Sequence, residues 1–140
     1  AYTDFVTPRT LYALDAATGA TTAVRPPPAA PVASDFRVEQ VRYRSRDGTL
    51  VPLTLVRRAD LPPGPRPTVL YGYGGFNVSL LPGYSAARMA WIEAGGTYAQ
   101  ANLRGGGEFG EEWHQAGTRL RKQNVFDDFI AAAEWLVAEG

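Results

Sequence analysis

The 140-residue sequence contains no cysteine and only one histidine, His114. Without cysteine the chain has no disulfide, no thiolate nucleophile and no cysteine-based zinc site. A single histidine also excludes a His-rich metal site built from this chain alone, so we expect no metal and no cofactor. The absence of cysteine suits an oxidising and a reducing compartment equally. We expect a cytoplasmic protein, with the periplasm as the alternative.

Net charge and long hydrophobic runs are missing as well. Basic and acidic side chains number 14 each, so no overall field attracts nucleic acid or anionic lipid. No run approaches the roughly 18 to 20 apolar residues of a membrane-spanning helix. We therefore expect neither nucleic acid nor membrane as a partner. Hydrophobic residues still make up 45% of the chain, which is enough for a packed core and predicts a globular domain.

A proline-rich stretch divides the chain into two parts. Three prolines stand at positions 26–28 and a fourth at Pro31, and because proline holds the backbone near polyproline II, we predict a stiff linker over residues 26–36. The preceding residues 1–25 contain two strand-like runs joined through Gly19, which predicts a β-hairpin. About 25 residues cannot bury a core of their own, so this hairpin should pack on something outside the chain.

The pattern changes after the linker. Residues 38–44 alternate apolar and polar side chains, Asp47-Gly48 predicts a hairpin turn, and residues 50–56 return as a second strand. Pro52 predicts a free edge on that strand. A strand at 67–71, a helix at 85–94, a strand at 97–103 and a helix from 124 onward follow. Residues 37–140 therefore predict an α/β fold whose sheet begins with an antiparallel edge.

The last helix shows a 3.6-residue apolar period. Asn124 is the expected N-cap, Asp127 and Asp128 are expected in the first turn, and Gly140 suits the C-terminal stop. In the isolated chain we expect Phe126, Phe129, Ile130 and Leu136 of this apolar stripe to stay uncovered. Its members are Phe126, Phe129, Ile130, Ala133, Leu136 and Val137.

The densest candidate site is the glycine–aromatic segment 71–77, Tyr-Gly-Tyr-Gly-Gly-Phe-Asn. In α/β-hydrolases the loop after this strand supplies an oxyanion-hole donor. Here Tyr73 with Gly74 and Gly75 would stand in its place, and the phenol O–H could donate to a developing oxyanion. The alternative is a Gly-rich turn with aromatic core residues. Spacing alone favours this second interpretation, because Gly-rich turns are common.

The other candidate residues favour structural roles. The cluster Arg104 to Glu108 matches no phosphate-loop pattern, and we expect Arg104 to anchor that loop. Ser85 follows Pro82-Gly83 rather than a strand, so it is an N-cap and not a nucleophile. His114 precedes any possible nucleophile, contrary to the order in hydrolases, and should be a structural or surface residue. No G-x-S-x-G occurs, and none of the four serines has a nucleophile's context. By itself the chain lacks an assembled catalytic machine.

Four segments in the same order resemble the prolyl oligopeptidase family. They are the glycine–aromatic segment 71–77, the Asn-Leu-Arg-Gly-Gly-Gly-Glu-Phe-Gly run at 102–110, Trp113-His114, and Lys-Gln-Asn followed by Phe-Asp-Asp-Phe within 122–129. The resemblance covers about residues 36 to 140.

This resemblance implies a serine endopeptidase that cuts short peptides after proline, with a catalytic α/β-hydrolase domain and a seven-bladed β-propeller that limits entry. Residues 1–25 would end the last propeller blade, and residues 37–140 would be the incomplete N-terminal part of the hydrolase domain. By position, Tyr73 would be the oxyanion-hole tyrosine and Phe76 would line the proline pocket. The catalytic triad would lie beyond residue 140. The implied partners are short proline-containing peptides and the remainder of the same polypeptide.

Three alternatives stay open. An oligopeptidase-B-like enzyme, which cuts after Lys or Arg, shares the Arg-Gly-Gly-Gly-Glu loop, although the segment 71–77 fits the prolyl branch better. A different α/β-hydrolase, such as an ester-cleaving one, could use the same scaffold. A non-catalytic α/β binding module could hold a ligand with its aromatic–glycine loop.

Overall fold

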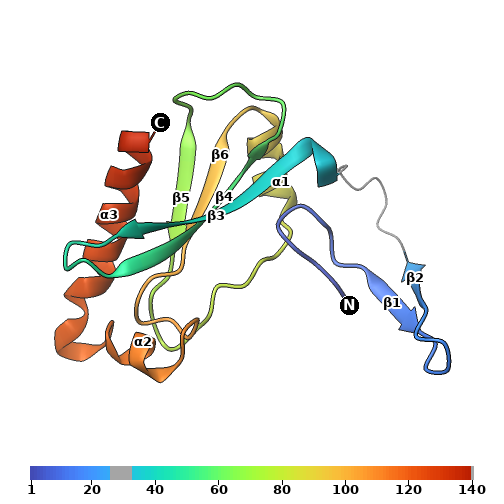
Figure 1. Cartoon of the computed structure of the whole chain (residues 1–140), viewed down its shortest axis with the longest axis horizontal. Helices are drawn as coiled ribbons and strands as arrows, with labels where there is room; N and C mark the ends of the chain where they lie inside the picture. Colours follow the sequence, from blue (N-terminus) through green and yellow to red (C-terminus); the bar gives the residue numbers. More distant parts are fainter. Residues whose placement is uncertain (26–32, 140) are drawn as a thin grey trace.

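A computed structural model describes residues 1–25 and 33–139 (Figure 1). Near the N-terminus, β1 (Leu11–Leu14) pairs antiparallel with β2 (Thr21–Arg25), and Gly19 in the connection takes a φ of 73°. This pairing confirms the predicted hairpin. The side chains of β1 are all exposed, and the hairpin projects away from the larger sheet. Residues 26–32 of the predicted linker lie outside the described residues, and the chain resumes with the 3₁₀ turn η1 (Ala33–Asp35).

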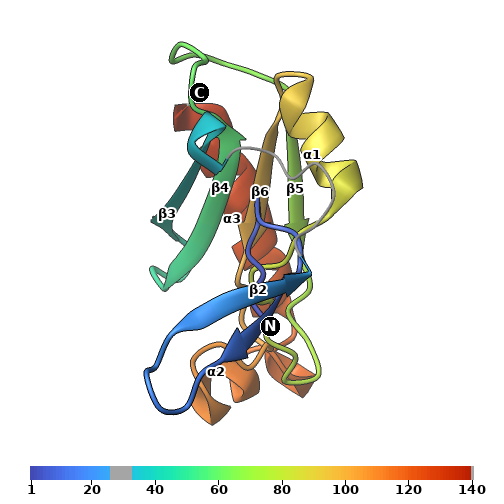
Figure 2. The ribbon, with the colours of Figure 1, turned by 90° about the vertical axis from the view of Figure 1, so that its right-hand side faces the viewer.

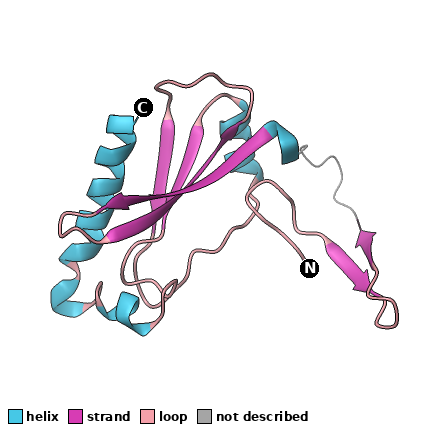
Figure 3. Ribbon diagram, viewed as in Figure 1, coloured by secondary structure: helices cyan, strands magenta, loops and turns pink. Residues whose placement is uncertain are grey.

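The larger sheet has four strands in the order β3-β4-β6-β5 (Figure 3). The hairpin of β3 (Phe36–Arg44) and β4 (Leu50–Arg58) is antiparallel, and β4 also pairs antiparallel with β6 (Thr97–Ala101). The edge strand β5 (Thr68–Gly72) pairs parallel with β6. The predicted strands and the antiparallel edge are therefore confirmed, with β6 ending two residues earlier than the pattern suggested.

The free edge predicted from Pro52 is wrong, because β4 lies between β3 and β6. The carbonyl oxygen of Pro52 accepts a hydrogen bond from the Asn102 N–H at 3.0 Å. The nitrogen and carbonyl of one strand residue point to the same side, so the missing N–H of Pro52 also faces the β6 side. There the ladder has just ended, at the pairing of Leu53 with Ala101. The proline therefore costs no ladder bond with β3.

Two helices cover opposite faces of the sheet (Figure 2). On one face, α1 (Ala86–Glu93) packs Met89 and Ile92 against Val56 and Tyr98. On the other face, α3 (Gln123–Glu139) packs Val125, Ala131 and Ala132 against Tyr43, Val51, Leu53, Ala99 and Ala101. The period-two alternation of β4 and β6 explains this division, because neighbouring strand residues point to opposite faces. A short helix, α2 (Glu111–Gln115), and the turn η2 (Arg119–Arg121) lead from β6 to α3.

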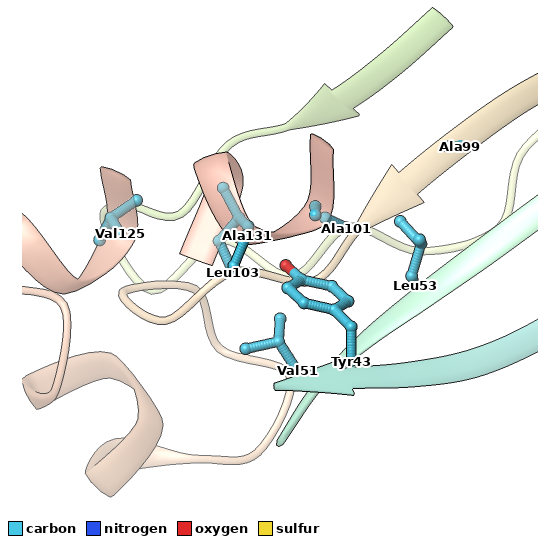
Figure 4. Packing of buried hydrophobic residues seen from close by; sticks show 9 residues of the cluster. Tyr43, Val51, Leu53, Ala99, Ala101, Leu103, Val125 and Ala131 are labelled. Atoms are coloured by element: carbon cyan, nitrogen blue, oxygen red, sulfur yellow. The ribbon is translucent and has the colours of Figure 1, made fainter. Parts of the chain in front are cut away.

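Figure 4 shows the core beneath α3, where the Tyr43 side chain rises from the end of β3 toward the helix. Its hydroxyl donates to the carbonyl oxygen of Asp128 at 2.8 Å. Burial, followed by the charge of Asp128, raises the pKa of Tyr43 above its usual value, so the phenol stays protonated. Tyr43 thus fills the core and ties the β3–β4 hairpin to α3.

The apolar stripe predicted for the last helix is only partly right. Phe129 and Leu136 pack against the core, whereas Phe126, Ile130 and Val137 are exposed. The buried face is centred instead on Val125, Asp128, Ala131 and Ala132. Small alanines let α3 approach the sheet closely, and a carboxylate occupies the position where an apolar residue would be expected. Of the four side chains expected to stay uncovered, Phe126 and Ile130 are exposed, whereas the expectation is wrong for Phe129 and Leu136.

The predicted start of this helix is also wrong. It begins at Gln123, one residue before Asn124, and Asn124 donates its side-chain amide to the Ala116 carbonyl at 2.8 Å. Asp127 and Asp128 lie beyond the first turn, which holds no acidic residue. Gly140 lies outside the described residues. The predicted N-cap at Ser85 is correct, since its side chain accepts from the Arg88 N–H of α1 at 3.4 Å.

Candidate functional site

Three chain segments converge at one end of the sheet. Because β5 and β6 are parallel, the loops that follow Gly72 and Ala101 leave from the same edge. The antiparallel register places the β3–β4 turn, residues 45–49, at this edge as well, since Leu53 of β4 pairs with Ala101. The two glycine-rich segments, residues 71–77 and 104–108, therefore lie together, although they are far apart in the chain.

Tyr73 and Phe76 form an exposed aromatic pair on the loop after β5. Their ring centroids lie 6.5 Å apart with an interplanar angle of 30°. The exposed fractions are 46% for Tyr73 and 86% for Phe76, so neither residue is part of the core. The interpretation of this loop as a turn with aromatic core residues is therefore wrong for these two side chains. Their rings present a phenol and an apolar face to whatever lies beyond the edge of the sheet.

The backbone of this loop is tightly constrained at Gly74. Its φ of 61° lies in the left-handed region, and a Cβ there would collide with Val125 and lie 2.9 Å from the carbonyl oxygen of Arg104. Only glycine satisfies both conditions. Phe76 and Asn77 also have positive φ values, 53° and 57°, which cost backbone energy in residues with a Cβ. The loop is thus held by its surroundings in one unusual conformation.

Arg104 anchors the second loop, as predicted. Its side chain is 4% exposed and that of Asp128 is fully buried. The guanidinium donates to Asp128 Oδ1 at 2.6 Å and to Asp47 Oδ2 at 2.5 Å, and Asp128 Oδ2 also accepts the Arg104 backbone N–H at 3.1 Å. The network joins the loop after β6, the turn between β3 and β4, and α3. Its partners further include the hydroxyls of Ser45 and Thr49.

The charges and hydrogen bonds in this network shift the pKa values of Arg104 and Asp47. Burial alone would lower the pKa of Arg104, but the hydrogen bonds and charges of Asp128 and Asp47 outweigh it and raise the pKa. The hydrogen bonds from Arg104 lower the pKa of Asp47 from 3.8 to about 2. At neutral pH the arginine and Asp47 are therefore both charged.

The two glycine loops are joined at Gly105. Its carbonyl oxygen accepts the Asn77 N–H at 3.1 Å, and its own N–H donates to the Trp113 carbonyl at 3.0 Å. His114 Nδ1 lies 2.9 Å from the same carbonyl oxygen, and since a carbonyl only accepts, Nδ1 must carry the proton. His114 is therefore a structural residue in this part of the chain, as the sequence indicated.

Glu108 braces the loop between Phe76 and α1, a role that sequence reasoning missed. Its Oε1 accepts the Leu80 N–H at 2.9 Å and the Asn102 amide at 3.1 Å. The Asn102 amide also donates to the Leu80 carbonyl at 3.1 Å. Among residues 1–25 and 33–139, Glu108 Oε2 is buried without a hydrogen-bond partner.

Sequence reasoning also missed Lys122, whose ammonium donates to the Gly74 carbonyl at 2.7 Å. Both residues lie within the quoted motifs, but only the fold shows what they contact.

The described residues contain no complete hydrolytic site. Ser45 is buried against Arg104, Ser85 caps α1, and no serine follows a strand in the manner of a nucleophile. No group of His, Asp or Glu in this part of the chain could hold a metal ion. A cavity of about 620 Å³ lies at the opposite end of the sheet, beside Leu55, Trp135 and Leu136. None of the helices described here has the length and apolar character needed to cross a bilayer.

Comparisons with known proteins agree on one family. The sequence model of the prolyl oligopeptidase family matches residues 82–140. The prolyl endopeptidase of Elizabethkingia meningoseptica is 44% identical over 140 residues, covering 99% of this chain and 20% of that protein. Prolyl oligopeptidase A of Galerina marginata is 49% identical over 105 residues, covering 74% of this chain and 14% of that protein. The chain thus spans about a fifth or less of the length of these relatives.

Solved structures give the same result. A prolyl endopeptidase structure matches with a TM-score of 0.90 and 49% identity, over 98% of this chain and 20% of that one. Oligopeptidase B from Trypanosoma brucei matches with a TM-score of 0.89 and 33% identity, over 99% of this chain and 20% of that one. The α/β sheet described above is thus the fold of part of a hydrolase domain. On sequence and structure together, this chain belongs to the prolyl oligopeptidase family.

Proposed function

We propose that the protein containing this chain is a serine endopeptidase that hydrolyses short peptides on the carboxyl side of proline. In this proposal Tyr73 donates to the oxyanion, and Phe76 forms part of the proline pocket. The observation that carries it is the Tyr73–Phe76 pair, which is exposed at the carboxyl edge of the sheet on a loop of fixed conformation. Among the described residues the Tyr73 phenol has no hydrogen-bond partner, and the apolar ring of Phe76 beside it is exposed. This pair suits a substrate with a carbonyl next to a pyrrolidine ring.

Each residue would act at a different point of the reaction. When a nucleophile from elsewhere in the polypeptide attacks the prolyl carbonyl, negative charge develops on its oxygen. A phenol held in place donates more strongly to that oxyanion than to the neutral carbonyl, and so lowers the barrier. Phe76 would instead pack on the proline ring and remove apolar surface from water in substrate and transition state alike.

The remainder of the same polypeptide is the second proposed partner. Phe126 and Ile130 are 52% and 54% exposed, and Val137 is 85% exposed, all on one side of α3. The outer edge of β5 is unpaired among the described strands. An apolar helix side and a free edge of this kind need a cover.

We further propose that residues 1–25 end a propeller blade and residues 37–140 begin the hydrolase domain, joined by the linker. The proposed compartment is the cytoplasm, with the periplasm as the alternative, and cell fractionation would test it.

The experiment compares Tyr73→Phe and Phe76→Ala in the full-length protein on a chromogenic proline amide. Tyr73→Phe keeps the ring and removes one oxyanion donor, so kcat should fall about a hundredfold while KM changes much less. Phe76→Ala should raise KM as well as reduce turnover, because it removes binding surface. A Tyr73→Phe kcat within about twofold of the parent, at equal stability, contradicts the oxyanion role. Parallel assays on an arginine amide and a simple acyl ester test the oligopeptidase-B-like and ester-cleaving alternatives.

A further inference from the structure

Lys122 is the only lysine in the chain, since the other 13 of its 14 basic residues are arginines. It stands between η2 and α3, and its half-buried side chain reaches back across 48 residues to the loop after β5. There Nζ donates to the Gly74 carbonyl at 2.7 Å. Such a bond from an ammonium is charge-assisted and stronger than one between neutral groups. Lys122 therefore holds the peptide group between Gly74 and Gly75, one residue beyond Tyr73.

The positive charge of Lys122 is not neutralised nearby. None of the ion pairs in the described ranges 1–25 and 33–139 includes it. The ring of Phe126 also lies near the Lys122 ammonium, with its centroid 6.0 Å from Nζ. By contrast, the charge of Arg104 is matched by two carboxylates. The loop that carries Tyr73 therefore lies beside a cation that has no counter-ion among the described residues.

Lys122 Nζ and the ring of Tyr73 both lie close to Gly75. A Cβ built on Gly75 would be 3.7 Å from Lys122 Nζ and 3.9 Å from Tyr73 Cε1, so the ammonium and the edge of the ring flank the same point. The opposite side of the loop is closed, because Gly74 packs on Val125 and Leu103. The backbone at Gly74, the residue after Tyr73, is thus held on one side by packing and on the other by a charged hydrogen bond.

We propose that Lys122 is a positioning residue for Tyr73 and that its charge favours the oxyanion. This inference rests on the proposed function, in which Tyr73 donates to that oxyanion. Through the Gly74 carbonyl, Lys122 holds the phenol at its donating distance. Through space, its uncompensated charge adds a positive potential where negative charge develops in the transition state. Both effects act on turnover more than on binding of the neutral substrate.

The test uses the full-length protein and three single variants. Lys122→Met removes the charge and the donor at similar length, Lys122→Arg keeps both, and Arg121→Met removes a neighbouring exposed charge as the matched control. We expect Lys122→Met to lower kcat about tenfold or more with KM within about twofold. Lys122→Arg should recover most of this loss, and Arg121→Met should resemble the parent. If Lys122→Met does not fold, Lys122→Gln takes its place and should show the same loss of kcat.

A double-variant cycle with Tyr73→Phe makes the test specific. If Lys122 acts through Tyr73, removing it in the Tyr73→Phe background should cost markedly less than in the parent. Strict additivity overturns the positioning of Tyr73 by Lys122. A Lys122→Met kcat within about twofold of the parent, or a change confined to KM, overturns the charge effect as well. A silent Lys122 variant beside an impaired Tyr73→Phe refutes this inference alone. A silent Tyr73→Phe refutes the proposed function and this inference with it.

Discussion

The buried network around Arg104 gives a sharp quantitative prediction for Arg104→Met. The substitution keeps an unbranched apolar side chain but leaves Asp128, which is 0% exposed, without its guanidinium partner. Only the Arg104 backbone N–H would still donate to that carboxylate. Leaving a buried charge uncompensated in this way costs about 3–5 kcal/mol. Because the network joins the loop after β6, the β3–β4 hairpin and α3, this cost should appear as local opening of all three.

An exposed ion pair in the same chain provides the control. Arg58 pairs with Asp60 at 2.5 Å, the same separation as Arg104 to Asp47, but the Arg58 and Asp60 side chains are 40% and 63% exposed. Solvent screens this exposed pair, so Arg58→Met should have little effect on stability. The two ion pairs have the same length but differ in exposure. The difference in stability loss between the two variants therefore measures the effect of burial.

Hydrogen exchange of the amides in β6 and α3, measured in the full-length protein, reads this cost locally. Arg104→Met should accelerate exchange there far more than Arg58→Met does. The double variant Arg104→Met, Asp128→Leu should recover much of the loss, because it removes the unpaired charge. Equal exchange in the two arginine variants would refute the reasoning. A double variant as unstable as Arg104→Met would show that the cost does not come from the uncompensated carboxylate.

Two further predictions concern the same edge of the sheet. Since the pKa of Asp47 is lowered from 3.8 to about 2 in the folded protein, its stabilisation is present above about pH 4 and lost as the pH falls toward 2. Asp47→Asn should therefore reduce the loss of stability over that pH window. The difference should be less than about 1 kcal/mol, because 47% of the Asp47 side chain is exposed. Identical acid unfolding curves for the variant and the parent would contradict this prediction. Gly74→Ala should lower kcat at least about tenfold through strain at a φ of 61° and collision with Val125. The control Gly83→Ala, with nothing within 4 Å of its new Cβ, should be silent, and equal activity of the two variants would count against a rigid Tyr73 loop.

Local sequence determined the elements of this fold. The period-two run of β3, the Asp-Gly turn and the return strand are written in adjacent residues, so the hairpin follows from the chain itself. The Ser85 cap and the anchoring role of Arg104 were also accessible, because proline and glycine before Ser85 excluded a nucleophile and no phosphate-loop pattern fitted Arg104. The family could be inferred because its motifs are long and occur in one order.

Tertiary structure decided the rest, because the deciding contacts join residues far apart in the chain. The buried face of α3 centres on Asp128 rather than on Phe126 and Ile130, since a buried arginine from the loop after β6 needs that carboxylate. Pro52 sits in an inner strand because its missing N–H falls where the ladder with β6 has ended. The bond from Lys122 to Gly74 spans 48 residues. No local period encodes such pairings, and only the packing of α3 against the sheet brings them together.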